Sequence, residues 1–201
     1  MKLVAATSNP KKLEEIRRIL SPLGFEVLPP PRTLEVKEEE RTFYGNAYLK
    51  AKAYAEAFGL PALADDSGLV VEKLKPYPGV YSARFYRLEW GGREEGSSPD
   101  EANVKKLLRL LKDEKDRRAY FVCCALVYYE GKAVSAEGYL YGSIAYEPKG
   151  TAGFGYDPVF VPENETRTLA QMTPQEKDAL SHRGKALRKL AELLKRCEGA
   201  L

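Results

Sequence analysis

The chain has 201 residues, of which 44% are hydrophobic and 30% are charged, and its formal net charge is only +3. This composition is typical of a globular protein with a substantial core, and it excludes a disordered, collagen-like or disulfide-stapled chain. No run approaches twenty apolar residues, no signal-peptide pattern is present and three cysteines make no disulfide framework, so we expect no membrane partner and a cytoplasmic location.

The first predicted elements are a strand over residues 2–6 and a helix over 10–23. Asn9 suits the helix N-cap and Pro10 its first turn, so unpaired N–H groups and the positive end of the helix dipole face the connection. The hydroxyls of Thr7 and Ser8 and the lysines of the first helical turn would complete a phosphate-binding turn, although the glycines of a P-loop are absent. Many α/β proteins begin this way, so an ordinary connection is the alternative. The turn consists of Thr7, Ser8, Asn9, Pro10, Lys11 and Lys12.

An acidic pair follows the next predicted elements, a strand over 25–28 and a helix over 43–58. Asp65 and Asp66 lie between short predicted strands at 62–64 and 69–73. Burying an unpaired carboxylate costs free energy, and a bound divalent cation usually offsets that cost. Mg²⁺ suits this pair, because it binds one or two carboxylates. Because side chains alternate along extended backbone, the two aspartates should point to opposite sides, with only one facing a ligand. An Asx-turn with Gly68 at positive φ is an equally weighted alternative.

The rest of the chain predicts further helices and a long hairpin. Capping boxes at 98–101 and 173–176 each open a helix, and Ser181 is placed to cap the last one. Strands over 120–129 and 132–141 flank Glu130-Gly131, which suits a hairpin turn. Long hairpin strands after alternating strands and helices predict an α/β fold with a mixed sheet.

Near the C-terminus, aromatic, glycine and basic residues gather in one stretch. Two glycines let the backbone approach a flat ligand, and Phe154 and Tyr156 offer ring faces. The polar groups of this stretch suit the edge of a heterocycle and its phosphates. Taken singly, each residue is more readily a core aromatic, a surface charge or a turn glycine. The cluster predicts a nucleotide pocket formed by Phe154, Gly155, Tyr156, Asp157, Lys177, His182 and Arg183.

Five motifs in register resemble the inosine triphosphate pyrophosphatase family. The resemblance extends from residue 2 to about residue 194, and it implies a single domain over 1–201 with two lobes. It also implies a mixed, elongated β-sheet flanked by helices, an active-site cleft between the lobes, and a homodimer. The motifs are TSNPKK at 7–12, ADDSGL at 64–69, PGVYSAR at 78–84, GFGYDP at 153–158 and SHRGKAL at 181–187.

The resemblance implies a role for each matching residue. Residues 7–12 would bind the triphosphate, Ser67 would contact substrate, and Asp66 would bind Mg²⁺ and activate the attacking water. Residues 154–157 would bind the base, with Phe154 stacking and Asp157 hydrogen-bonding the purine. Lys177 would contact the nucleotide. His182 and Arg183 would read the keto group at purine position 6.

A second metal ligand is expected from the segment before the helix at 43–58. Register to the family places it at Glu38. Here the segment reads EEE at 38–40 where relatives have a glycine, and Gly45 stands where they have glutamate. Glu39 and Glu40 therefore remain alternative ligands.

The resemblance implies a hydrolase of non-standard purine nucleoside triphosphates (dITP, ITP and XTP), which releases the monophosphate and pyrophosphate and so cleanses the nucleotide pool. The acidic pair and the basic residues fit such a Mg²⁺-dependent hydrolysis. A nucleic-acid-binding module is one alternative, because the isoelectric point is near 8.6 and the last helix is basic. We expect no nucleic-acid partner, since acidic residues dilute that surface. A pyrophosphatase of modified pyrimidine nucleotides is the other alternative.

Overall fold

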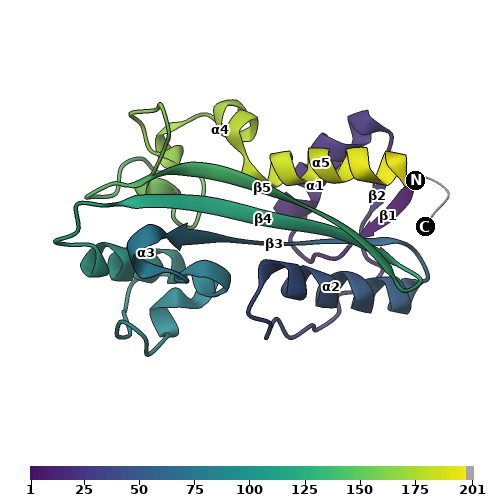
Figure 1. The fold of residues 1–201 in the computed structure, drawn as a ribbon, viewed down its shortest axis with the longest axis horizontal. Helices are drawn as coiled ribbons and strands as arrows, with labels where there is room; N and C mark the ends of the chain where they lie inside the picture. The colour runs from purple at the N-terminus through teal and green to yellow at the C-terminus, as the bar shows by residue number, and fades with distance from the viewer. Residues whose placement is uncertain (198–201) are drawn as a thin grey trace. The chain divides into compact units, whose positions relative to one another are not determined.

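The computed structural model describes residues 1–197 and has the helices and strands drawn in Figure 1. The strands are β1 (Lys2–Ala5), β2 (Glu26–Leu28), β3 (Ala62–Val71), β4 (Arg118–Tyr129), β5 (Lys132–Ile144) and β6 (Phe160–Pro162). The α-helices are α1 (Pro10–Leu20), α2 (Phe43–Phe58), α3 (Pro99–Leu110), α4 (Pro174–Leu180) and α5 (His182–Arg196). Short 3₁₀ segments are η1 (Ser21–Leu23), η2 (Glu72–Leu74), η3 (Gly79–Arg87), η4 (Asp157–Val159) and η5 (Leu169–Gln171).

The strands form one mixed sheet in the order β2-β1-β3-β4-β5-β6. β1 pairs in parallel with β2 and with β3, whereas β5 pairs antiparallel with β6. The longest strands, β3, β4 and β5, have 10, 12 and 13 residues. The predicted α/β fold with a mixed, elongated sheet is confirmed.

The residues group into two compact units, which match the two predicted lobes. Among the described residues, unit 1 consists of 1–67, 123–139 and 182–197, and unit 2 of Gly68–Val122 and Leu140–Ser181. The cleft between lobes and the single-domain assignment over 1–201 stay predictions.

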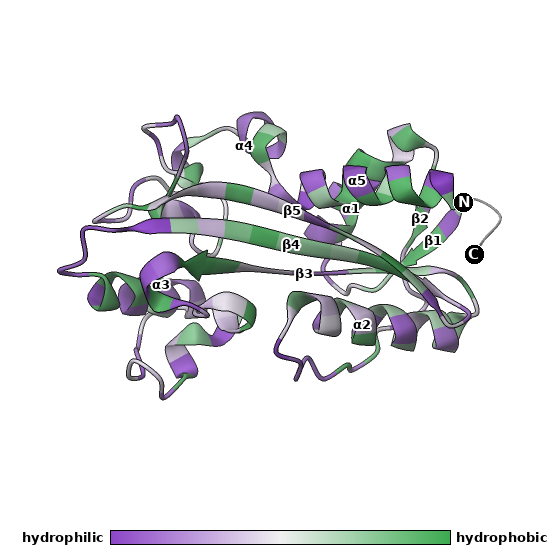
Figure 2. Cartoon of the chain, in the orientation of Figure 1, coloured by the Kyte–Doolittle hydropathy of each residue, from purple (hydrophilic) through white to green (hydrophobic). Residues whose placement is uncertain are grey.

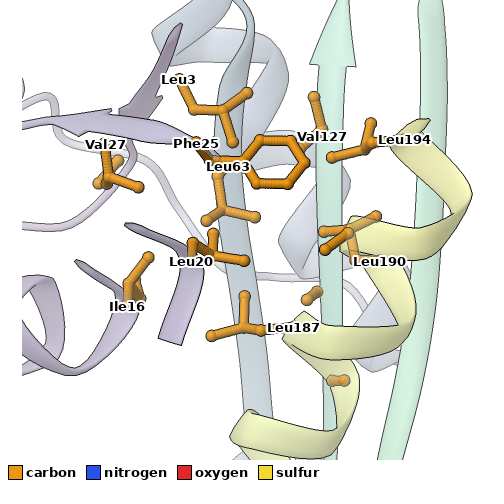
Figure 3. Packing of buried hydrophobic residues seen from close by; sticks show 14 of the residues in the cluster. Leu3, Ile16, Leu20, Phe25, Val27, Leu63, Val127, Leu187, Leu190 and Leu194 are labelled. Atoms are coloured by element: carbon orange, nitrogen blue, oxygen red, sulfur yellow. The ribbon is translucent and has the colours of Figure 1, made fainter. Parts of the chain in front are cut away.

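In unit 1, α1 and α5 cover one face of the strands and α2 covers the other (Figure 1). Because strand side chains alternate between faces, Leu63 packs with α1 and α5, whereas its neighbours Ala62 and Ala64 pack with α2. Figure 2 shows that α5 carries hydrophobic and hydrophilic residues in alternating bands, as expected for a helix with one buried stripe. The core under α1 and α5, shown in Figure 3, includes Leu3, Ile16, Leu20, Phe25, Val27, Leu63, Val127, Leu187, Leu190 and Leu194.

Unit 2 has its own core, formed by β3, β4, β5 and β6 with α3 and η3. Phe85 of η3 and Leu107 of α3 are fully buried in it. Lys106 is fully buried as well, and its ammonium donates to the carbonyls of Phe85 (2.9 Å) and Leu88 (3.0 Å). A buried ammonium needs such acceptors, so this lysine fixes the end of η3 against α3.

The acidic turn predicted between strands 62–64 and 69–73 is wrong. Residues 62–71 form one continuous strand, and Gly68 lies inside it without positive φ. The Asx-turn alternative is therefore also wrong. Cationic and amide groups from neighbouring elements stabilise the two carboxylates, so the backbone can stay extended. The strand ends at Val71 because η2 begins at Glu72.

Other local predictions are confirmed with small shifts. The helix predicted over 10–23 is α-helical to Leu20 and continues as the 3₁₀ turn η1. Glu130 and Gly131 both have positive φ (48° and 79°), as a two-residue hairpin turn requires. The capping box at 173–176 is confirmed and opens α4, whereas at 98–101 only the N-cap bond forms: Ser98 accepts from the Glu101 amide at 3.1 Å, but the Glu101 carboxylate pairs with Ser97 and Lys105 instead of the Ser98 amide. The sequence predicted neither η3 nor β6.

Candidate active site

The predicted phosphate-binding turn connects β1 to α1 in unit 1. The Asn9 side chain accepts from the amides of Lys11 (3.0 Å) and Lys12 (3.3 Å), which makes it the N-cap. The Thr7 hydroxyl accepts from the Asn9 amide at 3.1 Å. Ser8 and Lys11 are exposed. The turn is therefore preformed by its own side chains, and it carries two lysines at a helix N-terminus.

Asp65 and Asp66 project from opposite faces of β3, as predicted. Asp65 points to the side of α1 and α5, where it contacts Lys12 and Arg183. Asp66 points to the side of α2, where its Oδ2 accepts from the amide of Asn46 at 3.1 Å. The strand thus presents two carboxylates to two different sets of partners.

Asp65 joins the phosphate-binding turn to α5. Its Oδ1 lies 2.9 Å from Lys12 Nζ and its Oδ2 lies 3.0 Å from Arg183 Nε. Arg183 Nη1 also contacts Glu15 of α1 at 2.6 Å. The thiol of Cys123 donates to Asp65 Oδ2 at 3.7 Å. Burial opposes ionisation here, but the charges of Lys12 and Arg183 prevail and hold the pKa of Asp65 well below its usual range.

Asp66 has a different electrostatic environment. The pKa of Asp66 is raised to about 6: burial is the main cause, the charges of Glu38 and Asp65 act in the same direction, and Lys50 and Asn46 act against them. Lys50 Nζ contacts Glu38 Oε1 at 2.7 Å and donates to the Asp65 carbonyl at 2.6 Å. Asp66 is therefore a carboxylate that lacks full compensation for its negative charge.

Of the three glutamates at 38–40, Glu38 is the one directed to this site. It contacts Lys50, and its charge acts on Asp66. The backbone of Glu40 is held by Asn46, whose Oδ1 accepts from the Glu40 amide at 3.0 Å and whose Nδ2 donates to the Glu40 carbonyl at 3.4 Å. Gly45 allows this approach, because a Cβ there would lie 2.8 Å from Glu40 Cβ.

The donor set around Asp66 fits Mg²⁺. Within residues 1–197, no three histidine, cysteine or acidic side chains form a complete metal site. Mg²⁺ does not need one, because it binds one or two carboxylates and fills its shell with water and phosphate oxygens. Glu38 and Asp66 supply two oxygen-donor groups, and a cation would offset the repulsion between them.

Two further predicted residues lie in unit 1. The hydroxyl of Ser67 is buried and has no hydrogen-bond partner among the described residues, which fits a group that meets a substrate. His182 is the first residue of α5 and is partly buried. Gly138 of β5 lets the strand pass close to it, since a Cβ at Gly138 would lie 2.1 Å from the His182 carbonyl oxygen.

The aromatic loop, residues 153–157, belongs to unit 2 together with Lys177. Phe154 is 66% exposed, and Lys177 Nζ lies 4.6 Å from its ring centroid. Lys177 also contacts Asp157 Oδ2 at 2.5 Å, and the same oxygen accepts from the Phe154 amide at 3.1 Å. The exposed ring can stack on a flat ligand, with a cation held over one of its faces.

Tyr156 differs from Phe154, although the sequence predicts a ring face from each. Tyr156 is only 5% exposed, and its ring packs in the core of unit 2. Its hydroxyl donates to the Ser82 carbonyl at 2.6 Å. Tyr156 therefore holds the aromatic loop, and Phe154 is the residue whose ring is presented to solvent.

The predicted residues are divided between the two units: those at 7–12, Glu38, Asp66, Ser67, His182 and Arg183 belong to unit 1, and those at 154–157 with Lys177 belong to unit 2. Within unit 1, direct contacts join Lys12 and Arg183 to Asp65, and Lys50 to Glu38. Sequence reasoning missed Asn46 and Lys50, which bond the acidic pair from α2. Their spacing of four places both on one face of a helix, a signal that indicates a shared partner.

Comparison with known proteins gives a consistent result. Residues 3–193 match the model of the Ham1 family. A protein of Aquifex aeolicus named dITP/XTP pyrophosphatase is 56% identical over the full length of both chains. One of the same name from Hydrogenobaculum is 49% identical, covering 98% of this chain and 99% of the relative. The structure of a HAM1 protein from Coxiella burnetii superposes with a TM-score of 0.86 at 37% identity, covering 98% of this chain and 99% of that one.

Proposed function

The chain belongs to the Ham1 family, and on that basis we propose that it hydrolyses dITP, ITP and XTP to the nucleoside monophosphate and pyrophosphate. This membership agrees with the resemblance drawn from the five sequence motifs. Such an enzyme removes non-standard purine nucleotides from the nucleotide pool.

The observation that carries the proposal is the convergence on Asp65 and Asp66. Lys12 comes from the first turn of α1, Lys50 from α2 and Arg183 from α5, and all three contact Asp65: Lys12 and Arg183 through its carboxylate and Lys50 through its carbonyl. Asp66 is the next residue of β3 and accepts from Asn46 of α2. Phosphoryl transfer needs positioning and charge neutralisation more than covalent chemistry. A cluster of cations beside an undercompensated carboxylate supplies both.

The unit 1 residues have separate tasks in this proposal. The turn at 7–12 binds the triphosphate through its backbone N–H groups, hydroxyls and lysines. Asp66 accepts the proton of the attacking water, and Asn46 orients its carboxylate. Magnesium, held by Asp66 and Glu38, would neutralise phosphate charge and lower the pKa of a bound water. Lys50 keeps Glu38 beside the acidic pair.

In this proposal an aromatic ring and several hydrogen-bonding side chains recognise the purine base. Phe154 stacks on the purine, and Asp157 and Lys177 provide an acceptor and a donor. Arg183 is a pure donor, so with His182 it favours the oxygen at purine position 6 over the amino group of adenine. The ion pairs of Arg183 with Asp65 and Glu15 restrict its orientation, which suits a residue that discriminates.

Product analysis tests this proposal. Wild-type protein with dITP and Mg²⁺ should yield dIMP and pyrophosphate in equal amounts, and Asp66→Asn should yield almost none while it keeps the wild-type circular dichroism spectrum. Release of inorganic phosphate and dIDP would contradict the reaction type. Turnover of modified pyrimidine nucleotides in place of dITP would favour the alternative pyrophosphatase.

We also propose a homodimer in the cytoplasm. The dimer rests on the family resemblance, and light scattering after size-exclusion chromatography would test it: a mass of one chain would contradict it.

The three cysteines are free, which fits a reducing compartment. No helix in residues 1–197 is long and apolar enough to cross a membrane.

A further inference from the structure

The aromatic loop is attached to two elements for which the sequence suggested no role, η3 and the first turn of α3. We propose that Tyr156, through the Ser82 carbonyl, and Asp100, through the Gly155 amide, are positioning residues that fix the angle of the Phe154 ring and thereby set the selectivity for the base. This inference rests on the proposed function, because it assigns the selectivity of the same site.

The first attachment is the hydroxyl of Tyr156. It donates to the Ser82 carbonyl at 2.6 Å, from a side chain that is only 5% exposed. Burial raises the pKa of Tyr156, so the hydroxyl remains a donor at neutral pH. The two residues are 74 positions apart in the sequence, so this bond fixes the loop to a separate element.

Ser82 is itself rigidly held. Its hydroxyl accepts from the Leu69 amide of β3 at 2.9 Å and donates to the Gly79 carbonyl at 2.7 Å, and its side chain is buried. A fully bonded serine in a tight 3₁₀ segment cannot shift without leaving buried groups unpaired. The motif at 78–84 thus acquires a role: it carries the acceptor that positions the aromatic loop on β3.

The second attachment is the carboxylate of Asp100. Asp100 Oδ2 accepts from the Gly155 amide at 2.9 Å, across 55 residues of sequence. A bond from N–H to an ionised carboxylate is stronger than one between neutral groups. Gly155 has φ of 60° and no heavy atom within 4 Å of a Cβ position, so its backbone conformation, and not packing, requires glycine there.

These attachments leave Phe154 between fixed neighbours. The Phe154 amide donates to Asp157, and Lys177 lies over its ring, while the next two residues are held by α3 and η3. The ring is exposed, yet its backbone is anchored at Phe154 itself and at the two residues that follow. Pre-organisation of this kind lowers the ordering cost on binding, so loss of an attachment should raise KM before it lowers kcat.

Asp100 allows a test with a matched control. Asp100→Ala removes the acceptor, and Asp100→Asn restores one without the charge. Glu101→Ala removes a carboxylate from the same first turn of α3, where Glu101 pairs with Lys105 at 3.0 Å. We expect Asp100→Ala to raise KM for dITP about three- to tenfold and to lower the dITP-to-dATP ratio of kcat/KM, with kcat changed less than twofold. Asp100→Asn, which keeps an acceptor but loses the charge, should fall between wild type and Asp100→Ala, and Glu101→Ala should behave as wild type does.

Tyr156 has a matched control in unit 1. Tyr54 is 3% exposed, and its hydroxyl bonds the backbone of Leu34, accepting from the amide at 3.0 Å and donating to the carbonyl at 3.5 Å. Tyr156→Phe and Tyr54→Phe should lower the melting temperature by similar amounts. Only Tyr156→Phe should raise KM and reduce the preference for dITP.

The outcomes separate this inference from the proposed function. Wild-type protein that turns over dITP and dATP equally would contradict both, and that result needs no variant. If the wild-type protein prefers dITP over dATP, and Asp100→Ala and Tyr156→Phe keep the same preference, the inference is overturned and the proposed function stands. The inference would also be overturned if Glu101→Ala lost as much selectivity as Asp100→Ala, or if Tyr54→Phe lost as much as Tyr156→Phe.

Discussion

Substitution of asparagine for each of the adjacent aspartates of β3 should affect stability differently. Asp65→Asn removes a charge that two cations compensate, so it should destabilise the fold. Asp66→Asn removes a charge for which burial is the dominant effect, and asparagine can still accept from Asn46. Asp66→Asn should therefore leave stability nearly unchanged and abolish turnover.

The magnitude for Asp65 follows from its contacts. Its side chain is 5% exposed and receives Lys12 and Arg183 at 2.9 and 3.0 Å. Removing one partner of a buried ion pair costs about 3–5 kcal/mol. Arg183 keeps Glu15, and the side chain of Lys12 is 23% exposed and can turn to water, so we expect the lower end, roughly 3 kcal/mol. For a chain of this size that lowers Tm by about 6–12 °C.

Thermal unfolding of both variants at pH 7 measures this difference. Glu72→Gln is a suitable control, because it breaks an exposed pair with Lys75 and should cost less than about 1 kcal/mol. The folded-state pKa of Asp65 is lowered, so its contribution is present above the unfolded pKa of about 4 and is lost as pH falls further. The gap between wild type and Asp65→Asn should therefore shrink below pH 4. Equal Tm values for Asp65→Asn and wild type at pH 7 would refute the reasoning.

Three other predictions concern single side chains. Phe154→Ala should raise KM for dITP about five- to hundredfold, as expected for a lost stacking contact, and barely change Tm because the ring is exposed; an unchanged KM would exclude stacking. Arg183→Ala should lower both Tm and the preference for dITP over dATP, because its guanidinium is buried in two ion pairs; full preference for dITP would count against its role in reading the base. Burial raises the pKa of Cys124 to about 12 and that of Cys123 further, so at pH 8 a disulfide reagent should label Cys197 alone in native protein and all three thiols after denaturation; rapid labelling of the other two would contradict their burial.

Features with a local cause could be predicted from the sequence. Asn9 caps α1 and Glu130-Gly131 forms the hairpin turn, because each depends on a few neighbouring residues. The opposite orientation of Asp65 and Asp66 followed from strand alternation alone.

Features that depend on distant partners could not be predicted. β3 continues through two aspartates because Lys12, Lys50 and Arg183 stabilise them, and no local pattern reveals those contacts. The burial of Tyr156 could not be predicted for the same reason, because its ring packs in the core of unit 2 and its hydroxyl bonds the Ser82 carbonyl, 74 residues away in the sequence. The aromatic character of a residue predicts that it can stack, but the fold decides which ring stays exposed.

The most direct measurement is kcat/KM for pyrophosphate release from dITP, XTP, dATP and dGTP, each with Mg²⁺ and with chelator. Our account predicts that dITP and XTP exceed dATP and dGTP by more than about tenfold, and that chelator removes the activity. Equal values for the four nucleotides, or turnover that persists in chelator, would contradict it.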